Sequence, residues 1–206
     1  MYIKRDFREI CKLNVDALIA KVNQLREEDW YEDSSRQKEF AVHKDTQAIQ
    51  LVDNIMPGVE RPKVHRLYAD LKAEINPVLN AIKRDIDSRA NAKKLEKKYG
   101  KSCFVRVLLA RLNEDGKIPR HADTGPSLIY VHRVHCPLVT NSECEFFVGE
   151  SSRHMDVGTI VEINNCRMHA VHNRGTKKRI HLIADYYIPG ERIIDADGNP
   201  QICQIT

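Results

Sequence analysis

The pattern of hydrophobic positions changes near residue 100. In the first half, apolar residues recur at helical spacing along two stripes. The first stripe is Val15, Leu18, Val22 and Leu25, and Asn14 stands where it can cap the helix. The second stripe runs through residues 63–98 and consists of Val64, Tyr68, Leu71, Ile75, Val78, Ile82 and Ile86. Pro77 is predicted to break this stretch into two helices or to begin the second one.

From residue 103 the apolar residues come in short runs that are rich in β-branched and aromatic side chains. These runs are CFVRVLLARL, SLIYVHRVHCPLV, CEFFVG, GTIVEIN and KRIHLIADYYI, and turn-forming residues separate them. Short strands at this spacing indicate an antiparallel sandwich or barrel, among which a jelly roll fits best. A last pair, RIIDA and QICQI, flanks Asp197-Gly198 and predicts a hairpin.

Together these patterns predict an α+β protein with a single domain over residues 1–206. Residues 1–100 are expected to form mainly helical support, 101–189 a jelly-roll core and 190–206 a C-terminal hairpin. A chain of 206 residues can build one domain with a sizeable core, but it is short for two.

Composition narrows the class of protein. Apolar residues make up 42% and charged residues 30%, which is ordinary for a soluble globular protein. The net charge is only +4, from 33 basic and 29 acidic residues, so a nucleic-acid partner is not expected. The start MYIKRDFREI has no apolar signal-peptide core, and no run reaches the roughly 18 residues that span a bilayer. The chain is therefore expected to be cytoplasmic, with no membrane partner. The six cysteines form no CxxC pair, which excludes zinc-ribbon and thioredoxin motifs.

Three separated residues form a candidate metal site. His121 and Asp123 are two positions apart, and in an extended segment such side chains point the same way. By itself the pair is weak, because a loop carboxylate that caps a turn beside an exposed histidine gives the same pattern. His169 supplies a second imidazole, and two histidines with one carboxylate are the ligand set of non-haem Fe(II). Zinc hydrolases use this set as well, so the triad alone leaves the metal open. His172 competes with His169 for the distal position.

Arg179 favours an oxygenase over a hydrolase. It begins the run RIHLIADYY ten positions after His169, on a strand face shared with His181 and Ile183. A hairpin turning at residues 173–176 is predicted to bring it back beside the metal. A buried cation needs an anionic partner, and a guanidinium matches a carboxylate with two parallel hydrogen bonds.

Arg133 and His135 add to this anion site. They share one face of the SLIYVHRVHCPLV run, and together with Arg179 they are expected to surround a small dianion beside the metal. The alternative is that the two strand arginines pair with Glu145 or Asp185 on the outside of the sheet.

Four segments carry a family resemblance, in this order: HADTG, HRVHCPLVTN, VGTIVEINNCRMHAVHNRG and RIHLIADYYIP. The stretch from Arg111 to Pro189 resembles the aspartyl/asparaginyl β-hydroxylase family of Fe(II)- and 2-oxoglutarate-dependent oxygenases. The resemblance implies a double-stranded β-helix (jelly roll) with N-terminal supporting helices. It also implies that Fe(II), 2-oxoglutarate as co-substrate and O₂ take part in the reaction.

The resemblance assigns roles to matching residues. The iron ligands of the family are matched by His121, Asp123 and His169. Arg179 matches the residue that pairs with the distal carboxylate of 2-oxoglutarate, and Arg133 and His135 match positions that help hold this co-substrate. Animal peptide-hydroxylating members have glycine where this chain has Asp123. The chain is therefore more similar to the microbial-type branch, whose substrates are diverse.

The segment SSRQKEFAVHKDTQAIQLV resembles the region that precedes the barrel in microbial members. Arg36 is a candidate for contact with a substrate carboxylate, and His43 and Asn165 are further candidates for substrate contact. The alternative for this segment is a helix-to-strand connector with solvated polar groups.

These expectations converge on a dioxygenase that hydroxylates a C–H bond of a free amino acid or similar small carboxylate. Succinate and CO₂ would be the co-products. One alternative is a peptide or protein aspartyl/asparaginyl β-hydroxylase. Another, from a different class, is a non-catalytic cupin-like barrel that binds a metal or a ligand.

Overall fold

The computed structural model describes residues 5–32, 44–53, 62–123, 126–194 and 200–202. The strands of a larger sheet are β1 (Phe7–Lys12), β9 (Thr159–Ile163), β6 (His132–Val139), β11 (Arg179–Tyr187), β4 (Cys103–Leu112), β2 (Thr46–Asp53) and β3 (Lys63–Val64). Those of a smaller sheet are β5 (Lys117–His121), β10 (His169–Asn173), β7 (Cys144–Val148) and β8 (Ser151–Arg153). The helices are α1 (Asp16–Val22), the 3₁₀ helix η1 (Glu27–Trp30), α3 (Arg66–Ala90), α4 (Ala92–Tyr99) and α5 (Pro126–Ile129). Near the C-terminus, β12 (Arg192–Ile194) pairs antiparallel with β13 (Pro200–Ile202), in the region of the expected terminal hairpin.

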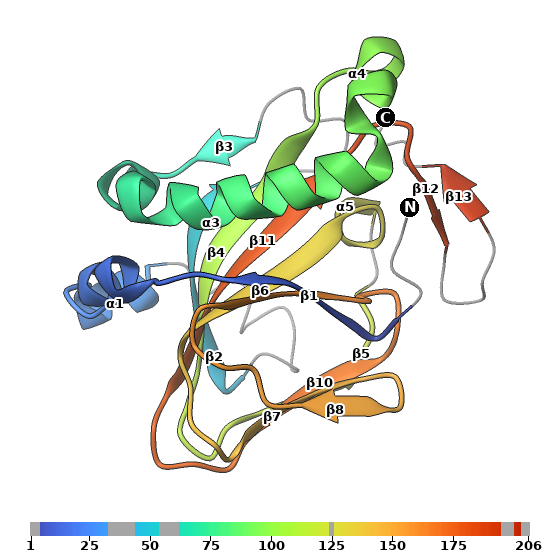
Figure 1. Cartoon of the computed structure of the whole chain (residues 1–206). Coiled ribbons are helices and arrows are strands. Elements are labelled where there is room, and N and C mark those ends of the chain that lie inside the picture. The colour runs from blue at the N-terminus through green and yellow to red at the C-terminus, as the bar shows by residue number, and fades with distance from the viewer. Residues whose placement is uncertain (1–4, 33–43, 54–61, 124–125, 195–199, 203–206) are drawn as a thin grey trace.

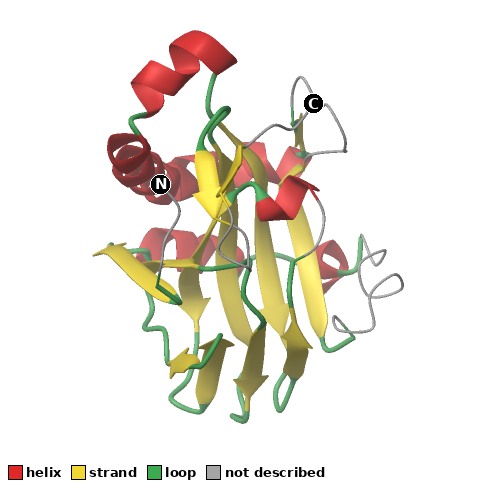
Figure 2. Ribbon diagram, turned by 90° about the vertical axis from the view of Figure 1, so that its right-hand side faces the viewer, coloured by secondary structure: helices red, strands yellow, loops and turns green. Residues whose placement is uncertain are grey.

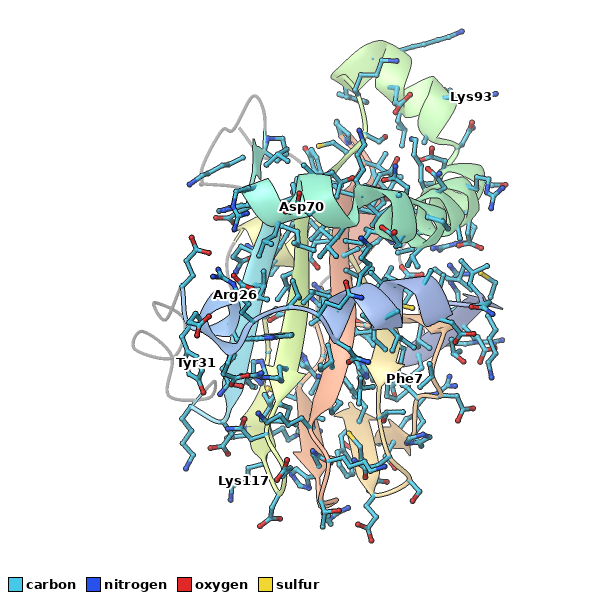
Figure 3. The ribbon with its side chains drawn as sticks, turned by 90° about the vertical axis from the view of Figure 1, so that its left-hand side faces the viewer. Phe7, Arg26, Tyr31, Asp70, Lys93 and Lys117 are labelled. Atoms are coloured by element: carbon cyan, nitrogen blue, oxygen red, sulfur yellow. The ribbon has the colours of Figure 1, made fainter. Side chains whose placement is uncertain are left out.

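The two sheets are antiparallel and lie against each other. The larger has the strand order β1-β9-β6-β11-β4-β2-β3, and the smaller has the order β5-β10-β7-β8. Figure 1 shows α3 crossing the larger sheet on the side away from the smaller one, and Figure 2 shows the helices lying outside the strands. In Figure 3, Lys93 on α4 and Lys117 on β5 lie toward opposite ends of this body. The arrangement is the predicted double-stranded β-helix.

The first half of the chain contributes strands as well as helices. The buried side chains of α3 pack on the outer face of the larger sheet, and they are Leu71, Ile75, Val78, Leu79, Ala81, Ile82 and Ile86. Pro77 lies inside this helix, so the predicted break there is wrong: packing on both sides of the proline outweighs its local cost. The helix instead ends at Asn91, a residue in the left-handed conformation (φ 54°) that separates α3 from α4. Residues 1–100 also supply β1, β2 and β3 to the larger sheet, which the sequence pattern did not indicate.

The short helix α1 begins close to its predicted start. Its N-cap residue is Val15, one position after the predicted cap, while the Asn14 side-chain oxygen accepts a hydrogen bond from the N–H of Asp16 at 2.9 Å. Leu18 and Val22 are its buried residues. No helix within the described ranges has both the length and the apolar content needed to cross a bilayer.

Alternation along β11 separates a helix-facing side from a barrel interior. Leu182, Ala184 and Tyr186 belong to the core beneath α3. Arg179 and Ile183, on the opposite side, line a cavity that the smaller sheet closes. A second apolar core joins the sheets and consists of Leu112, Cys144, Phe146, Val148, Met155, Val161, Ile163 and Val171.

The predicted hairpin through residues 173–176 is wrong. β10 pairs with β5 and β7 of the smaller sheet, whereas β11 pairs with β4 and β6 of the larger one. The chain crosses from one sheet to the other between them, and the Asn173 carboxamide ties this crossing by donating to the carbonyls of Asn113 and Lys177, each at 2.8 Å. Arg179 therefore faces His169 from the opposite sheet.

Candidate active site

The three candidate metal ligands lie together at the end of the smaller sheet. The antiparallel register of β5 and β10 places His121 opposite His169, with the ring centroids 4.3 Å apart. Asp123 follows two residues after β5 ends, and its Oδ2 lies 3.9 Å from Nε2 of His169. One ligand atom from each residue lies within 4.8 Å of the others, so a single ion can be held between them.

Both imidazoles are held by their Nδ1 atoms. Nδ1 of His121 lies 2.9 Å from the carbonyl oxygen of Pro119, and Nδ1 of His169 lies 3.0 Å from that of Arg167. Because a carbonyl only accepts, each Nδ1 carries the hydrogen and each Nε2 carries the lone pair that a metal requires. Burial lowers the pKa of His169 to about 4, although the Asp123 carboxylate opposes this shift. The ring is therefore neutral at physiological pH.

Arg179 is a buried cation on the opposite wall. Its side chain is only 2% exposed, and its Nη2 donates to Nδ1 of His181 at 2.6 Å. The ring of Phe146 lies 5.8 Å from the guanidinium carbon. Within the described ranges, no carboxylate forms an ion pair with Arg179, and its buried Nε has no hydrogen-bond partner. Burial lowers the pKa of Arg179 to about 10, because little nearby negative charge offsets the loss of water around the guanidinium.

His181 fixes the orientation of this guanidinium. Since Arg179 can only donate, Nδ1 of His181 accepts, and the ring carries its hydrogen on Nε2. Burial, together with the charge of Arg179, lowers the pKa of His181 well below its ordinary value. His181 is therefore a neutral acceptor that holds Arg179 in place.

Arg133 contacts one of the candidate metal ligands, Asp123, directly. Its Nη1 donates to Oδ2 of Asp123 at 2.6 Å, and its Nε and Nη2 each donate to the carboxylate of Asp185 at 2.8 Å. The predicted alternative pairing of Arg133 with Asp185 thus occurs, but in the barrel interior instead of on the outside. His135 lies beside His181, with their Nδ1 atoms 3.4 Å apart.

One cavity between the sheets connects these groups. Its polar lining includes His121, Arg133, His135, His169 and Arg179. An apolar wall comes from interior positions of both sheets, namely Ala110, Ile118, Phe146, Val171 and Ile183, and the buried Thr46 lies beside it. Sequence reasoning did not assign this wall to the site. The run CEFFVG indicated a strand, but nothing in it marked Phe146 as part of the site.

The remaining candidates lie elsewhere. Arg36 and His43 fall outside the described residues. Asn165 is buried, its side-chain amide donates to the carbonyl of Leu128, and it is absent from the cavity lining; its substrate role stays a prediction. The ring of His172 lies 5.1 Å from that of Phe147, also outside the cavity lining, in agreement with the choice of His169.

Comparison with known proteins identifies the class. Residues 90–189 match the model of the aspartyl/asparaginyl beta-hydroxylase family. The chain is a 2-oxoglutarate-dependent oxygenase, and this part of it is similar to the aspartyl/asparaginyl hydroxylases. Among curated proteins, none matches its sequence.

Solved structures share the fold of this oxygenase. A 2OG-Fe(II) oxygenase family oxidoreductase from Burkholderia pseudomallei is 16% identical and has a TM-score of 0.50, with 87% of this chain and 92% of that chain covered. A Pseudomonas putida prolyl-4-hydroxylase is 14% identical, with a TM-score of 0.50 and coverage of 91% and 95%. A Trichoplax adhaerens prolyl hydroxylase, in complex with a hypoxia inducible factor oxygen degradation domain peptide fragment, is 13% identical, with a TM-score of 0.58 and coverage of 90% and 84%. Identities this low support the fold alone.

The side chains of the oxygenase fit its cofactors, Fe(II), 2-oxoglutarate and O₂. Two imidazole nitrogens and a carboxylate suit Fe(II), and the spacing of His121, Asp123 and His169 allows one ion to reach all three. Arg179, a buried guanidinium without a carboxylate in the described structure, suits one end of a dicarboxylate.

Proposed function

We propose that this oxygenase hydroxylates a C–H bond of a free amino acid or similar small carboxylate, with His121, Asp123 and His169 as the iron ligands. The observation that carries the proposal is the pairing of that triad with Arg179 across one cavity. A buried cation without a counter-charge is costly, so the cavity favours entry of an anion. A dicarboxylate that reaches from Arg179 to the metal would neutralise the guanidinium at one end and bind the metal at the other.

In the proposed mechanism the protein positions the reactants. When bound, iron and 2-oxoglutarate supply the oxidising chemistry, in which 2-oxoglutarate becomes succinate and CO₂ and one oxygen atom of O₂ enters the substrate. Arg179 binds the distal carboxylate with its planar fork of N–H donors, and His181 keeps that fork aligned. The apolar wall around Phe146 keeps water away from the reacting centre. Arg133 and His135, at the same cavity, are proposed to help hold the co-substrate.

The small-molecule preference rests on the position of the cavity. Its lining comes from interior positions of strands in both sheets, which suits a ligand enclosed between them better than an extended chain. A peptide substrate is the second candidate, since one solved relative of the same fold holds a peptide fragment. The family match leaves the non-catalytic cupin-like alternative without support.

A paired turnover screen tests the proposal. Purified protein with Fe(II), 2-oxoglutarate and ascorbate is offered each free amino acid in turn, and then peptides that contain aspartate, asparagine or proline. Succinate release and the mass gain of one oxygen atom in the substrate are measured together. We expect at least one free amino acid or small carboxylate to show both signals.

The Asp123→Ala variant is the negative control, because it lacks a proposed metal ligand. Turnover of peptides alone would overturn the small-molecule assignment and favour the second candidate. Equal turnover by wild type and Asp123→Ala would overturn the assigned iron site.

A further inference from the structure

We infer that Asp185 is a positioning residue of the metal site, which aims Arg133 at the carboxylate of Asp123. This inference rests on the proposed role of Asp123 as an iron ligand. It adds a residue that lies one contact away from the ligands and is itself neither a candidate ligand nor part of the cavity lining.

Three charged side chains stand in one row across the larger sheet. Asp185 on β11 is in register with Arg106 on β4 and with Arg133 on β6. Neighbours in register on one face of a sheet are close enough for direct contact. Arg106 Nη1 donates to Asp185 Oδ2 at 2.9 Å, while Arg133 grips both oxygens of the same carboxylate at 2.8 Å.

Arg133 links Asp185 to Asp123, so the position of Asp185 determines how Arg133 contacts Asp123. A guanidinium is rigid and planar, so anchoring its Nε and Nη2 edge on Asp185 fixes where Nη1 lies. That Nη1 donates to Oδ2 of Asp123 at 2.6 Å, and the same Oδ2 lies 3.9 Å from Nε2 of His169. The contact therefore sets the rotation of the Asp123 carboxylate beside the histidines.

Together with Asp123 the row is balanced in charge, and its central carboxylate is buried. Two guanidinium groups face two carboxylates, and Asp185 is 0% exposed. Burial alone would raise the pKa of Asp185, but Arg133 and Arg106 outweigh it and hold the pKa below its ordinary value. Asp185 is thus ionised, and its loss would remove two of the hydrogen bonds that orient the Arg133 guanidinium.

A purely structural role makes a different prediction. If Asp185 only neutralised two buried cations, then Arg106 and Arg133 would be equivalent partners. Removing one charge of each sign would then restore the net charge of the cluster and, with it, Fe(II) binding. If it positions Arg133, then Arg106 is dispensable for metal binding, because Arg106 contacts Asp185 but not Asp123.

The test compares Asp185→Asn, Arg106→Gln and the charge-balanced double variant that carries both. Each is titrated with Fe(II) under nitrogen without 2-oxoglutarate, and the absorption spectrum of each Co(II)-loaded protein is recorded. We expect Asp185→Asn and the double variant to bind Fe(II) about 10- to 100-fold more weakly, with an altered Co(II) spectrum. Arg106→Gln is expected to match wild type in both measurements.

Wild-type affinity and spectrum in Asp185→Asn would overturn the inference. So would equal losses in the two single variants with recovery in the double variant, since that result fits simple neutralisation. If Asp185→Asn does not fold, the double variant, whose buried charges balance, carries the same comparison. The Asp123→Ala variant is titrated alongside. Unchanged Fe(II) binding in Asp123→Ala would refute the proposed iron site itself. Weaker binding in Asp123→Ala with intact binding in Asp185→Asn would refute only the positioning role of Asp185.

Discussion

Replacing Arg179 with methionine separates the binding role of this residue from its effect on stability. Methionine keeps an unbranched chain of similar length but removes the charge and the N–H fork. In the protein without ligand, Arg179 is a buried cation, and burial lowers its pKa to about 10, which corresponds to about 3 kcal/mol against the charged form. The variant gives up the hydrogen bond to His181, about 1 kcal/mol, and the contact with the Phe146 ring, about 1 kcal/mol.

The free energy of unfolding of the ligand-free variant is therefore expected to be no lower than that of wild type and up to about 1 kcal/mol higher. Binding of 2-oxoglutarate moves in the opposite direction. Removing one partner of a buried charge pair costs at least about 2–5 kcal/mol, so the dissociation constant should rise by about 30-fold or more. Fe(II) affinity should stay close to wild type, because Arg179 contacts none of the three proposed ligands.

Urea denaturation of the ligand-free protein and calorimetric titration of 2-oxoglutarate into the metal-loaded protein under nitrogen measure the two effects. Arg174→Met is the matched control, since the Arg174 side chain is 58% exposed and pairs loosely with Glu145 at 3.4 Å. It should leave 2-oxoglutarate binding unchanged. Wild-type affinity for 2-oxoglutarate in Arg179→Met would refute the anchor assignment. A loss of several kcal/mol in the ligand-free variant would show that the cation is well compensated.

Three further predictions follow from other parts of the structure. Asp123→Ala should abolish substrate hydroxylation and weaken Fe(II) binding in an anaerobic titration; activity at the wild-type level would contradict the ligand assignment. Burial alone would lower the pKa of His132, but the hydrogen bonds that its ring donates to the Glu162 and Glu191 carboxylates outweigh burial and raise the pKa to about 9. Between pH 6.5 and 9 the folded state therefore holds a proton on His132 that the unfolded chain has lost. The stabilisation from this proton is complete below pH 6.5 and is lost as the pH rises through 9. Melting temperatures measured across this pH range should fall in wild type, and this fall should be absent in His132→Gln. Gly158→Ala should cost about 1–3 kcal/mol in urea denaturation, because φ is 76° and an added methyl group would meet a backbone carbonyl.

The metal triad was predictable because it depends on local geometry and on a family pattern. Side chains two residues apart in an extended segment point the same way, so His121 and Asp123 were predicted to face one metal ion. His169 was a candidate by residue type and by its ten-position distance from Arg179, and the family resemblance matched it to an iron ligand. Its place opposite His121 depends on the register between β5 and β10, which the sequence does not show. The alternation of Arg179 with His181 likewise indicated that both lie on one face.

Features that depend on long-range pairing were not predictable. The crossing after β10 was taken for a hairpin, because loop composition does not tell whether two strands share a sheet. Pro77 marked a helix end by local propensity, yet packing against the larger sheet carries α3 through it. Asp185 was considered only as an outer partner, since its place beside Arg106 and Arg133 follows from the register of three strands that are distant in sequence.

The central claim is that one cavity holds iron on three side chains and a dicarboxylate on Arg179. Crystals grown without oxygen in Mn(II) and 2-oxoglutarate test it directly through the anomalous signal of the metal. The expected map has one strong peak in contact with Nε2 of His121, Nε2 of His169 and the Asp123 carboxylate, with 2-oxoglutarate density ending on the Arg179 guanidinium. A metal peak on other residues, or a co-substrate whose carboxylate avoids Arg179, would contradict the account.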